Sequence, residues 1–186
     1  MGKTIGIRYL MLIMASLSIT LFLACGDEAT GPEAGPGDWQ WHEVGDFRFD
    51  WLVEDSLSSL RIKMKAPTTG WVAVGFDPTS FMNEANLLIG YVSGGTANIR
   101  DDYGTGQITH DADTNLGGTN DVTMISGSES SGETTIEFRI PLDSGDMYDK
   151  VITEGTTYLI IFAYGANGSD DFTSKHAWAE SVSLEI

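Results

Sequence analysis

Apolar and polar residues alternate along much of the chain beyond residue 38. Phe47, Phe49 and Trp51 alternate with Arg48 and Asp50, which is the two-residue period of a strand with one buried face. The same period recurs in three further segments: 60–65, 135–140 and 181–186. Three other segments are continuous apolar runs, which are typical of central strands: 70–76, 87–92 and 158–164.

Short turn motifs separate these segments. They are Asp77-Pro78, Ser93-Gly94-Gly95, Gly117-Gly118, Ser126-Gly127 and Ser131-Gly132. Residues 81–88 suit at most one helical turn, and we find no internal repeat. Many short strands with such spacing predict an all-β sandwich or barrel.

The first 25 residues have the pattern of an export signal. Lys3 and Arg8 precede an uncharged apolar segment, residues 9–24, that is short for a membrane span but suits a signal peptide. Residues 21–25 (LFLAC) resemble a bacterial lipobox, which implies cleavage after residue 24 and lipidation of Cys25, the only cysteine. The alternative is an ordinary secretory signal with an incidental cysteine. Residues 25–37, rich in Gly, Pro and acidic residues, then form a flexible tether, and residues 38–186 form one domain. We therefore expect an exported protein, anchored to a membrane by lipid and facing the periplasm or the cell exterior.

The chain is strongly acidic. Its formal net charge is −17, and loss of Lys3 and Arg8 with the signal would make it more negative still. Such a surface repels phosphate backbones, which excludes nucleic acid as a partner. It favours cations, basic partners or uncharged ligands, although acidity that serves only solubility is an equal alternative.

An ordered set of motifs resembles the DOMON domain, the module named after the N-terminal part of dopamine β-monooxygenase. The motifs are GWVAVGF (70–76), MNEANLLIGYV (82–92), DY (102–103), IEFR (136–139) leading into PLDSGD (141–146), AYG (163–165) and His176. The resemblance covers about residues 40–186. It implies an immunoglobulin-like β-sandwich of about ten antiparallel strands. It also implies one of two functions, since one branch of the family holds a b-type haem and other members bind sugars or other ligands.

The resemblance to the haem-binding branch assigns two axial ligands. Met82 and His176 stand at the matching positions, and Met–His is a known axial pair in cytochromes. If strands 71–76 and 158–164 run in the same direction, both ligand loops open at one end of the sandwich. Phe81, Phe172 and Trp178 would then line the cavity. The chain has no CxxCH motif, so the haem b would be held without covalent bonds. Lys175 is a substitute ligand, and His110 is a weaker one.

A second candidate site is the polar segment 111–121. Asp111, Asp113, Asn115 and Asp121 place oxygen ligands at alternate positions, which suits calcium. Leu116 replaces the glycine that an EF-hand turn needs, and Val122 stands where its closing Glu belongs, so an EF-hand is excluded. Asp101 and Asp102 are further contributors. The alternative is a solvated acidic loop.

Motifs of hydrolytic, metalloprotease or phosphate-binding enzymes are lacking in the sequence. The leading hypothesis is therefore an extracytoplasmic b-type electron-transfer domain that works with a separate redox partner. The first alternative is a haem-free module for a carbohydrate or other small molecule, in which Trp39, Trp41 and Trp178 stack on the ligand. The second is a calcium-stabilised structural or adhesion domain.

Overall fold

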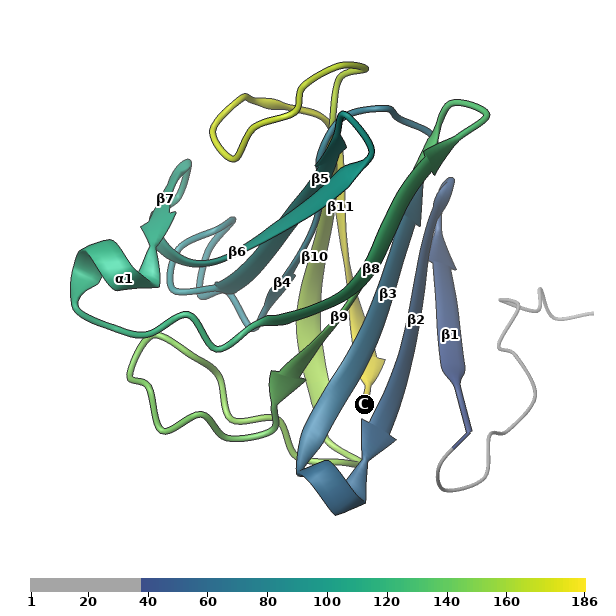
Figure 1. Cartoon of the computed structure of the whole chain (residues 1–186). Coiled ribbons are helices and arrows are strands. Elements are labelled where there is room, and N and C mark those ends of the chain that lie inside the picture. The colour runs from purple at the N-terminus through teal and green to yellow at the C-terminus, as the bar shows by residue number, and fades with distance from the viewer. Residues whose placement is uncertain (1–37) are drawn as a thin grey trace, which may run out of the picture.

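Two antiparallel β-sheets pack face to face in the computed structural model, which describes residues 38–186 (Figure 1). The five-stranded sheet has the order β1 (Gln40–Val44), β2 (Phe47–Glu54), β3 (Ser59–Ala66), β9 (Glu133–Pro141), β8 (Thr123–Ser130). The six-stranded sheet has the order β11 (His176–Glu185), β10 (Thr157–Gly165), β4 (Val72–Phe76), β5 (Asn86–Ser93), β6 (Thr96–Gly106), β7 (Thr109–Ala112). Two short helices complete the described part of the chain: η1 (Asp55–Leu57) and α1 (Asp113–Leu116).

The core lies between the sheets and follows from the alternation in the sequence. Phe47, Phe49 and Trp51 of β2 point inward and are nearly inaccessible to solvent. The Phe162 ring of β10 lies between two of them, 5.2 Å from the Phe47 ring and 5.3 Å from the Phe49 ring. Burial of such side chains is the main free-energy gain of folding.

A second apolar cluster covers the outer face of the six-stranded sheet. Trp71, Ala73 and Ile89 are buried there, and Phe172 packs against them from the connection between β10 and β11. Strands β4 and β5 are therefore apolar on both faces, which explains why their sequences read as continuous runs. Gly75 belongs to the same face, where an added Cβ would lie 2.5 Å from Leu87 Cδ2.

The connections gather at two ends of the sandwich. The turns between β1 and β2, β3 and β4, β5 and β6, and β8 and β9 lie at the upper end in Figure 1, together with the β10–β11 connection. The opposite ends of these strands hold η1, the loop 77–85, the β6–β7 turn and the long connection 142–156. Neighbouring strands in both sheets are antiparallel, so successive connections lie at alternate ends of the strands.

The all-β sandwich prediction is confirmed, and all seven predicted strand segments are strands. The sequence did not reveal β1, β6, β7 and β8. In β8, an edge strand, most side chains are exposed, so no apolar alternation marks it. The turn predicted at Ser126-Gly127 is wrong, because both residues lie within β8 beside an irregularity in its pairing with β9. The predicted signal, the tether and Cys25 lie outside the described residues. Within residues 38–186, no helix is long and apolar enough to cross a membrane.

Candidate functional site

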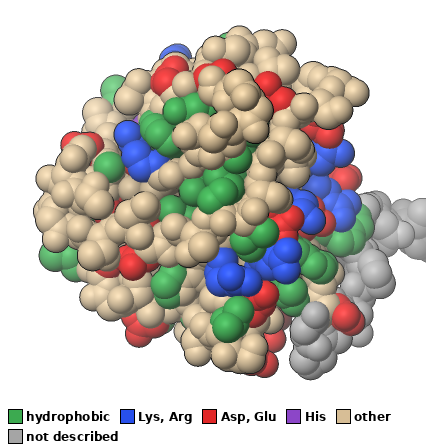
Figure 2. Space-filling model, in the orientation of Figure 1, with side chains coloured by type: hydrophobic (Ala, Val, Ile, Leu, Met, Phe, Trp, Pro, Cys, Tyr) green, Lys and Arg blue, Asp and Glu red, His purple; other side chains and the backbone are tan. Residues whose placement is uncertain are grey.

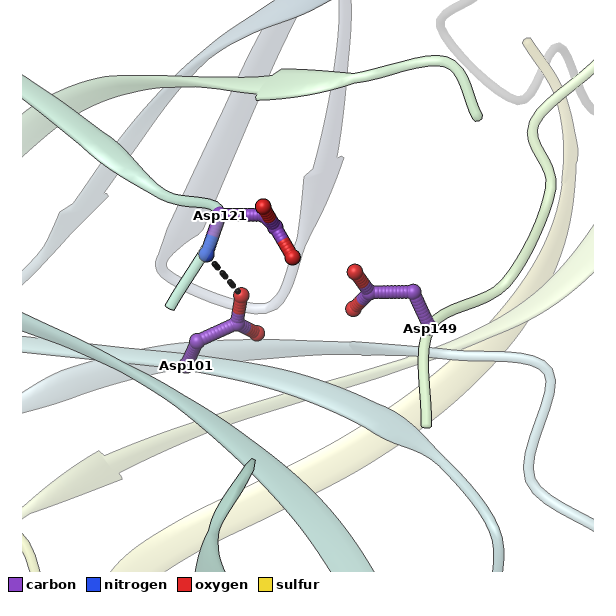
Figure 3. Close-up of side chains that lie close together, drawn as sticks. All are labelled: Asp101, Asp121 and Asp149. Carbon is purple, nitrogen blue, oxygen red and sulfur yellow. Dashed lines mark hydrogen bonds between the residues drawn. The ribbon is translucent and has the colours of Figure 1, made fainter. Parts of the chain in front are cut away.

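Three carboxylates from distant parts of the chain converge beside the six-stranded sheet (Figure 3). Asp101 lies in β6, Asp121 lies between α1 and β8, and Asp149 lies in the connection between β9 and β10. One oxygen of each lies within 4.8 Å of one oxygen of both others. We call these three residues the acidic cluster.

Asp101 is the deepest member of the acidic cluster. Its side chain is only 2% exposed because it points from β6 toward the core, opposite Leu88 of β5. One carboxylate oxygen accepts a hydrogen bond from the Asp121 backbone N–H at 3.1 Å, and the other has no partner. Burial, and then the nearby charges of Asp149 and Asp113, raise the pKa of Asp101 to about 8.

A fourth carboxylate lies beside the cluster without any protein partner. Asp113, the first residue of α1, is fully buried, and neither of its oxygens accepts a hydrogen bond. Burial, followed by repulsion from Asp149 and Asp146, raises its pKa to about 7. Unsatisfied buried carboxylates are costly and need an explanation, such as an ion.

Neighbouring side chains hold the cluster in place. Asn86 Nδ2 donates to Asp149 Oδ1 at 2.7 Å, which leaves Asn86 Oδ1 buried and unpartnered. Burial is also the main reason that the pKa of Asp149 is raised. Asp146 accepts hydrogen bonds from the backbone N–H groups of Tyr148 and Thr119, which lower its pKa and tie the two loops together.

The donors of the acidic cluster suit a hard cation. Calcium lies about 2.3–2.6 Å from its oxygen ligands, so two oxygens on one ion are at most about 5 Å apart. The 4.8 Å limit within the cluster meets this requirement. Carboxylate and amide oxygens are ligands that calcium prefers, and no histidine or cysteine joins the group among the described residues.

Half of the calcium ligands predicted from sequence lie at or beside this cluster. Asp101 and Asp121 are members and Asp113 is adjacent, whereas Asp111, Asn115 and Asp102 are placed elsewhere. Asn115 Nδ2 donates to Asp111 Oδ1 at 2.8 Å on the outer side of α1, because residues 113–116 form a helical turn instead of an extended loop. No pattern along the chain pointed to Asp149, which lies in an irregular connection.

Asp102, the neighbour of Asp101, faces the outer side of the sheet. Its carboxylate is fully buried and accepts hydrogen bonds from Arg100 Nε at 2.5 Å and Nη2 at 2.6 Å. His110 Nδ1 lies 2.6 Å from the same carboxylate. His110, the weaker haem ligand in the sequence analysis, is therefore engaged with Asp102.

Met82 and His176 lie at opposite ends of the six-stranded sheet. The assumption that strands 71–76 and 158–164 run in the same direction is wrong, because β4 and β10 are antiparallel. Met82 follows the lower end of β4 and its backbone N–H donates to Gln107 O at 3.4 Å. His176 pairs with Gly165 just beyond the upper end of β4. The five residues of β4 alone place about 13 Å between the two ends.

The predicted wall residues also lie apart. Phe81 is 73% exposed in the loop 77–85. Phe172 packs on Tyr91, with ring centroids 4.9 Å apart, over the outer face. Trp178 stacks on Tyr164 at 5.2 Å on the inner face of the same sheet. These three side chains therefore do not line one cavity.

The aromatic residues of the sugar-binding alternative are covered by other side chains. Lys63 and Arg61 lie over the Trp39 ring, 4.8 and 5.3 Å from its centroid, and Arg48 lies 4.2 Å from that of Trp41. Most Lys and Arg side chains in view in Figure 2 gather on this side, over the five-stranded sheet and among acidic residues. Trp39 and Trp41 therefore already stack on cations.

Comparison with known proteins identifies the domain. A family model described as the DOMON domain matches residues 43–165. The human protein named DBH-like monooxygenase protein 1 is 30% identical over 122 residues, which make up 64% of this chain and 18% of that protein. DBH-like monooxygenase protein 2 of Mus musculus is 24% identical over 135 residues, 72% of this chain and 21% of that protein. The chain thus spans about a fifth of the length of these relatives.

Two solved structures share the fold. They are the cytochrome b domain of pyranose dehydrogenase from Coprinopsis cinerea and the cytochrome domain of cellobiose dehydrogenase from Myriococcum thermophilum. Each has a TM-score of 0.58. The first is 15% identical in sequence, and the match covers 79% of this chain and 81% of the solved chain. The second is 12% identical, and the match covers 80% of this chain and 82% of the solved chain. At this level of identity the likeness establishes the fold.

Proposed function

Because this chain belongs to the DOMON domain family, we propose that it is a haem-free recognition module of the cell exterior, stabilised by one calcium ion in the acidic cluster. The observation that carries the proposal is the convergence of Asp101, Asp121 and Asp149, in which one buried oxygen of Asp101 finds no protein partner. A divalent cation among the three carboxylates would satisfy that oxygen and remove the repulsion among them.

Calcium fits this group better than other common cations. The donors are carboxylate and amide oxygens, which exclude the soft metals that thiolate or imidazole ligands select. Magnesium retains several waters and requires near-ideal octahedral geometry, whereas the three clustered carboxylates come from three separate segments and are buried or half-buried.

The proposed ion links parts of the chain that have little regular structure. It connects β6 with the segment between α1 and β8 and with the connection between β9 and β10. Cross-linking these segments in the folded state alone stabilises that state by mass action. Its role is therefore to fix the shape of the loops at this side of the domain.

A haem held by Met82 and His176 does not fit the arrangement of the described residues. A thioether and an imidazole are suitable donors, and the fold neighbours are named cytochrome domains. However, the two residues lie at opposite ends of β4, and Phe172 packs against the apolar outer face of this sheet. We therefore assign no electron-transfer step to this chain.

We further propose that the protein is exported and anchored by lipid at Cys25, with residues 25–37 as the tether. The sequence of residues 1–25 supports this proposal, and so does the family, whose members are typically extracellular. The monooxygenase chemistry in the names of the relatives is not part of the proposal, because the chain spans only a fifth of their length.

Calorimetric titration of residues 26–186, stripped of metal with a chelator, tests the calcium proposal directly. We expect one calcium ion to bind per chain, with magnesium binding much more weakly, and the Asp101→Asn variant to lose the site. Absence of calcium binding to the wild-type protein would refute the proposal. An absorption spectrum after expression with ample haem tests the second part, and a Soret band would overturn the haem-free assignment.

A further inference from the structure

Two neighbouring loops, 77–85 and the β6–β7 turn, expose large apolar side chains. Phe81 in the loop 77–85 is 73% exposed, and Ile108 at the β6–β7 turn is 85% exposed. The loops are joined by two hydrogen bonds: Met82 N donates to Gln107 O at 3.4 Å, and Gln107 Nε2 donates to Ser80 Oγ at 3.2 Å. The two exposed apolar side chains are therefore carried by loops that lie side by side.

The loop that carries Phe81 is braced along its length. Thr79 N donates to Asn83 O at 2.9 Å, and Asn83 N donates to Ser80 O at 2.9 Å. Glu84 N donates to Gly104 O of β6 at 2.7 Å. A loop bonded in this way holds its side chains in a defined position.

The backbone of Phe81 is held in an unfavourable conformation. Its φ of +53° lies in the left-handed region, which bulky residues rarely adopt. Its ring gains little burial that would offset this strain. Strained residues that the surrounding structure holds in place concentrate at functional sites and ligand contacts.

The surface around these side chains is acidic. Asp77 and Glu84 are exposed at the two ends of the loop that carries Phe81. Residues 77–85 and 104–112, which form both loops and their flanks, include no Lys or Arg. An apolar centre inside a charged rim is the usual anatomy of a protein–protein interface.

We propose that Phe81 and Ile108 form the apolar centre, and Asp77 and Glu84 the acidic rim, of a docking surface for a protein partner. The partner presents apolar side chains flanked by Lys and Arg. Charge selects this occupant, because an anionic membrane or a second copy of this chain, whose net charge is −17, would place like charges together. This proposal does not depend on calcium binding at the acidic cluster.

A selection of random displayed peptides against the purified protein, residues 26–186, tests this proposal. We expect the enriched peptides to combine aromatic or aliphatic residues with Lys or Arg. Their affinity should fall at least about tenfold in the double variant Phe81→Ser, Ile108→Ser, and salt should weaken it. The matched control is Leu57→Ser, because Leu57 is 57% exposed on η1, outside both loops; this variant should bind as the wild type does.

Three outcomes would overturn the proposal. The first is that no peptides are enriched, or that the enriched peptides lack Lys and Arg. The second is equal binding to the double variant and to the wild type, with circular dichroism showing that both are folded. The third is that the double variant abolishes sedimentation with phosphatidylcholine vesicles or self-association in the ultracentrifuge, since the surface would then serve a membrane or a second copy.

Discussion

Asp101 and Asp102 are adjacent in β6, yet their carboxylates lie on opposite faces of the six-stranded sheet. Asp101 points toward the core and joins the acidic cluster, while Asp102 points outward to Arg100 and His110. The alternation of a strand thus gives two neighbouring acids different roles. Asp102 is hydrogen-bonded to Arg100 and lies against His110, whereas Asp101 lies beside other acidic side chains.

We expect calcium to raise the melting temperature of residues 26–186 and a chelator to lower it. The ion binds the folded state alone, so the stabilisation at one hundred times the dissociation constant is about 2.7 kcal/mol. For a domain of this size that corresponds to roughly 5–11 °C. Calorimetric scans with calcium, magnesium or chelator measure the shift, and equal effects of magnesium and calcium would contradict the assignment of the ion.

Replacement of Asp113 by Asn should have opposite effects on the metal-free and the calcium-bound protein. The amide removes a buried charge that repels Asp149 and Asp146, so the metal-free domain gains stability. The same change removes a negative charge beside the acidic cluster and lowers calcium affinity by about tenfold or more. Calorimetric titration and thermal melts measure the two effects.

The control for this variant is Asp111→Asn. Asp111 lies two residues earlier, accepts a hydrogen bond from Asn115 and stands outside the acidic cluster. The Asp111→Asn variant should leave calcium affinity unchanged. A loss of affinity in this control equal to that of Asp113→Asn would indicate that overall charge, and not the cluster, determines binding.

Replacement of Asp102 by Ala should destabilise the domain without weakening calcium binding. It leaves the Arg100 guanidinium and His110 without their buried partner, and breaking a buried ion pair from one side costs about 3–5 kcal/mol. Urea unfolding followed by fluorescence measures the loss. An unchanged midpoint would show that solvent replaces the carboxylate at little cost.

The sequence predicted the sandwich and its central strands because burial on one or both faces leaves a periodic or continuous apolar pattern. It did not predict β6, since Asp101 and Asp102 interrupt the apolar residues there for reasons that depend on tertiary contacts. The acidic cluster was found only in part for the same reason: spacing along the chain placed Asp121 near Asp113 but carried no information on Asp149. The pairing of Met82 with His176 depended on strand direction, which apolar patterning does not encode.

Expression with ample haem should give a colourless protein. Met82 and His176 lie at opposite ends of β4, and Phe172 covers part of the apolar outer face of the sheet. Absorption spectra of the wild type, Met82→Ala and His176→Ala should therefore be alike above 350 nm, about the lower edge of haem absorption, since haem iron needs its axial ligands at one site. A Soret band that either substitution removes would show that the loops rearrange around a haem.

The stability of the metal-free protein should fall as the pH rises from about 4 to about 8. Burial and neighbouring acids raise the pKa of Asp101 to about 8 and that of Asp113 to about 7, whereas both titrate near 3.9 when unfolded. Between these values the folded state holds more protons than the unfolded state, so each step up in pH favours unfolding. Calcium binds the deprotonated carboxylates and should remove this loss, because the ion replaces the protons. Melting temperatures measured from pH 4 to pH 8 with calcium and with chelator test both statements. If the chelator series rises steadily to pH 8, these two carboxylates are not protonated in the folded protein, and the electrostatic argument for the site fails.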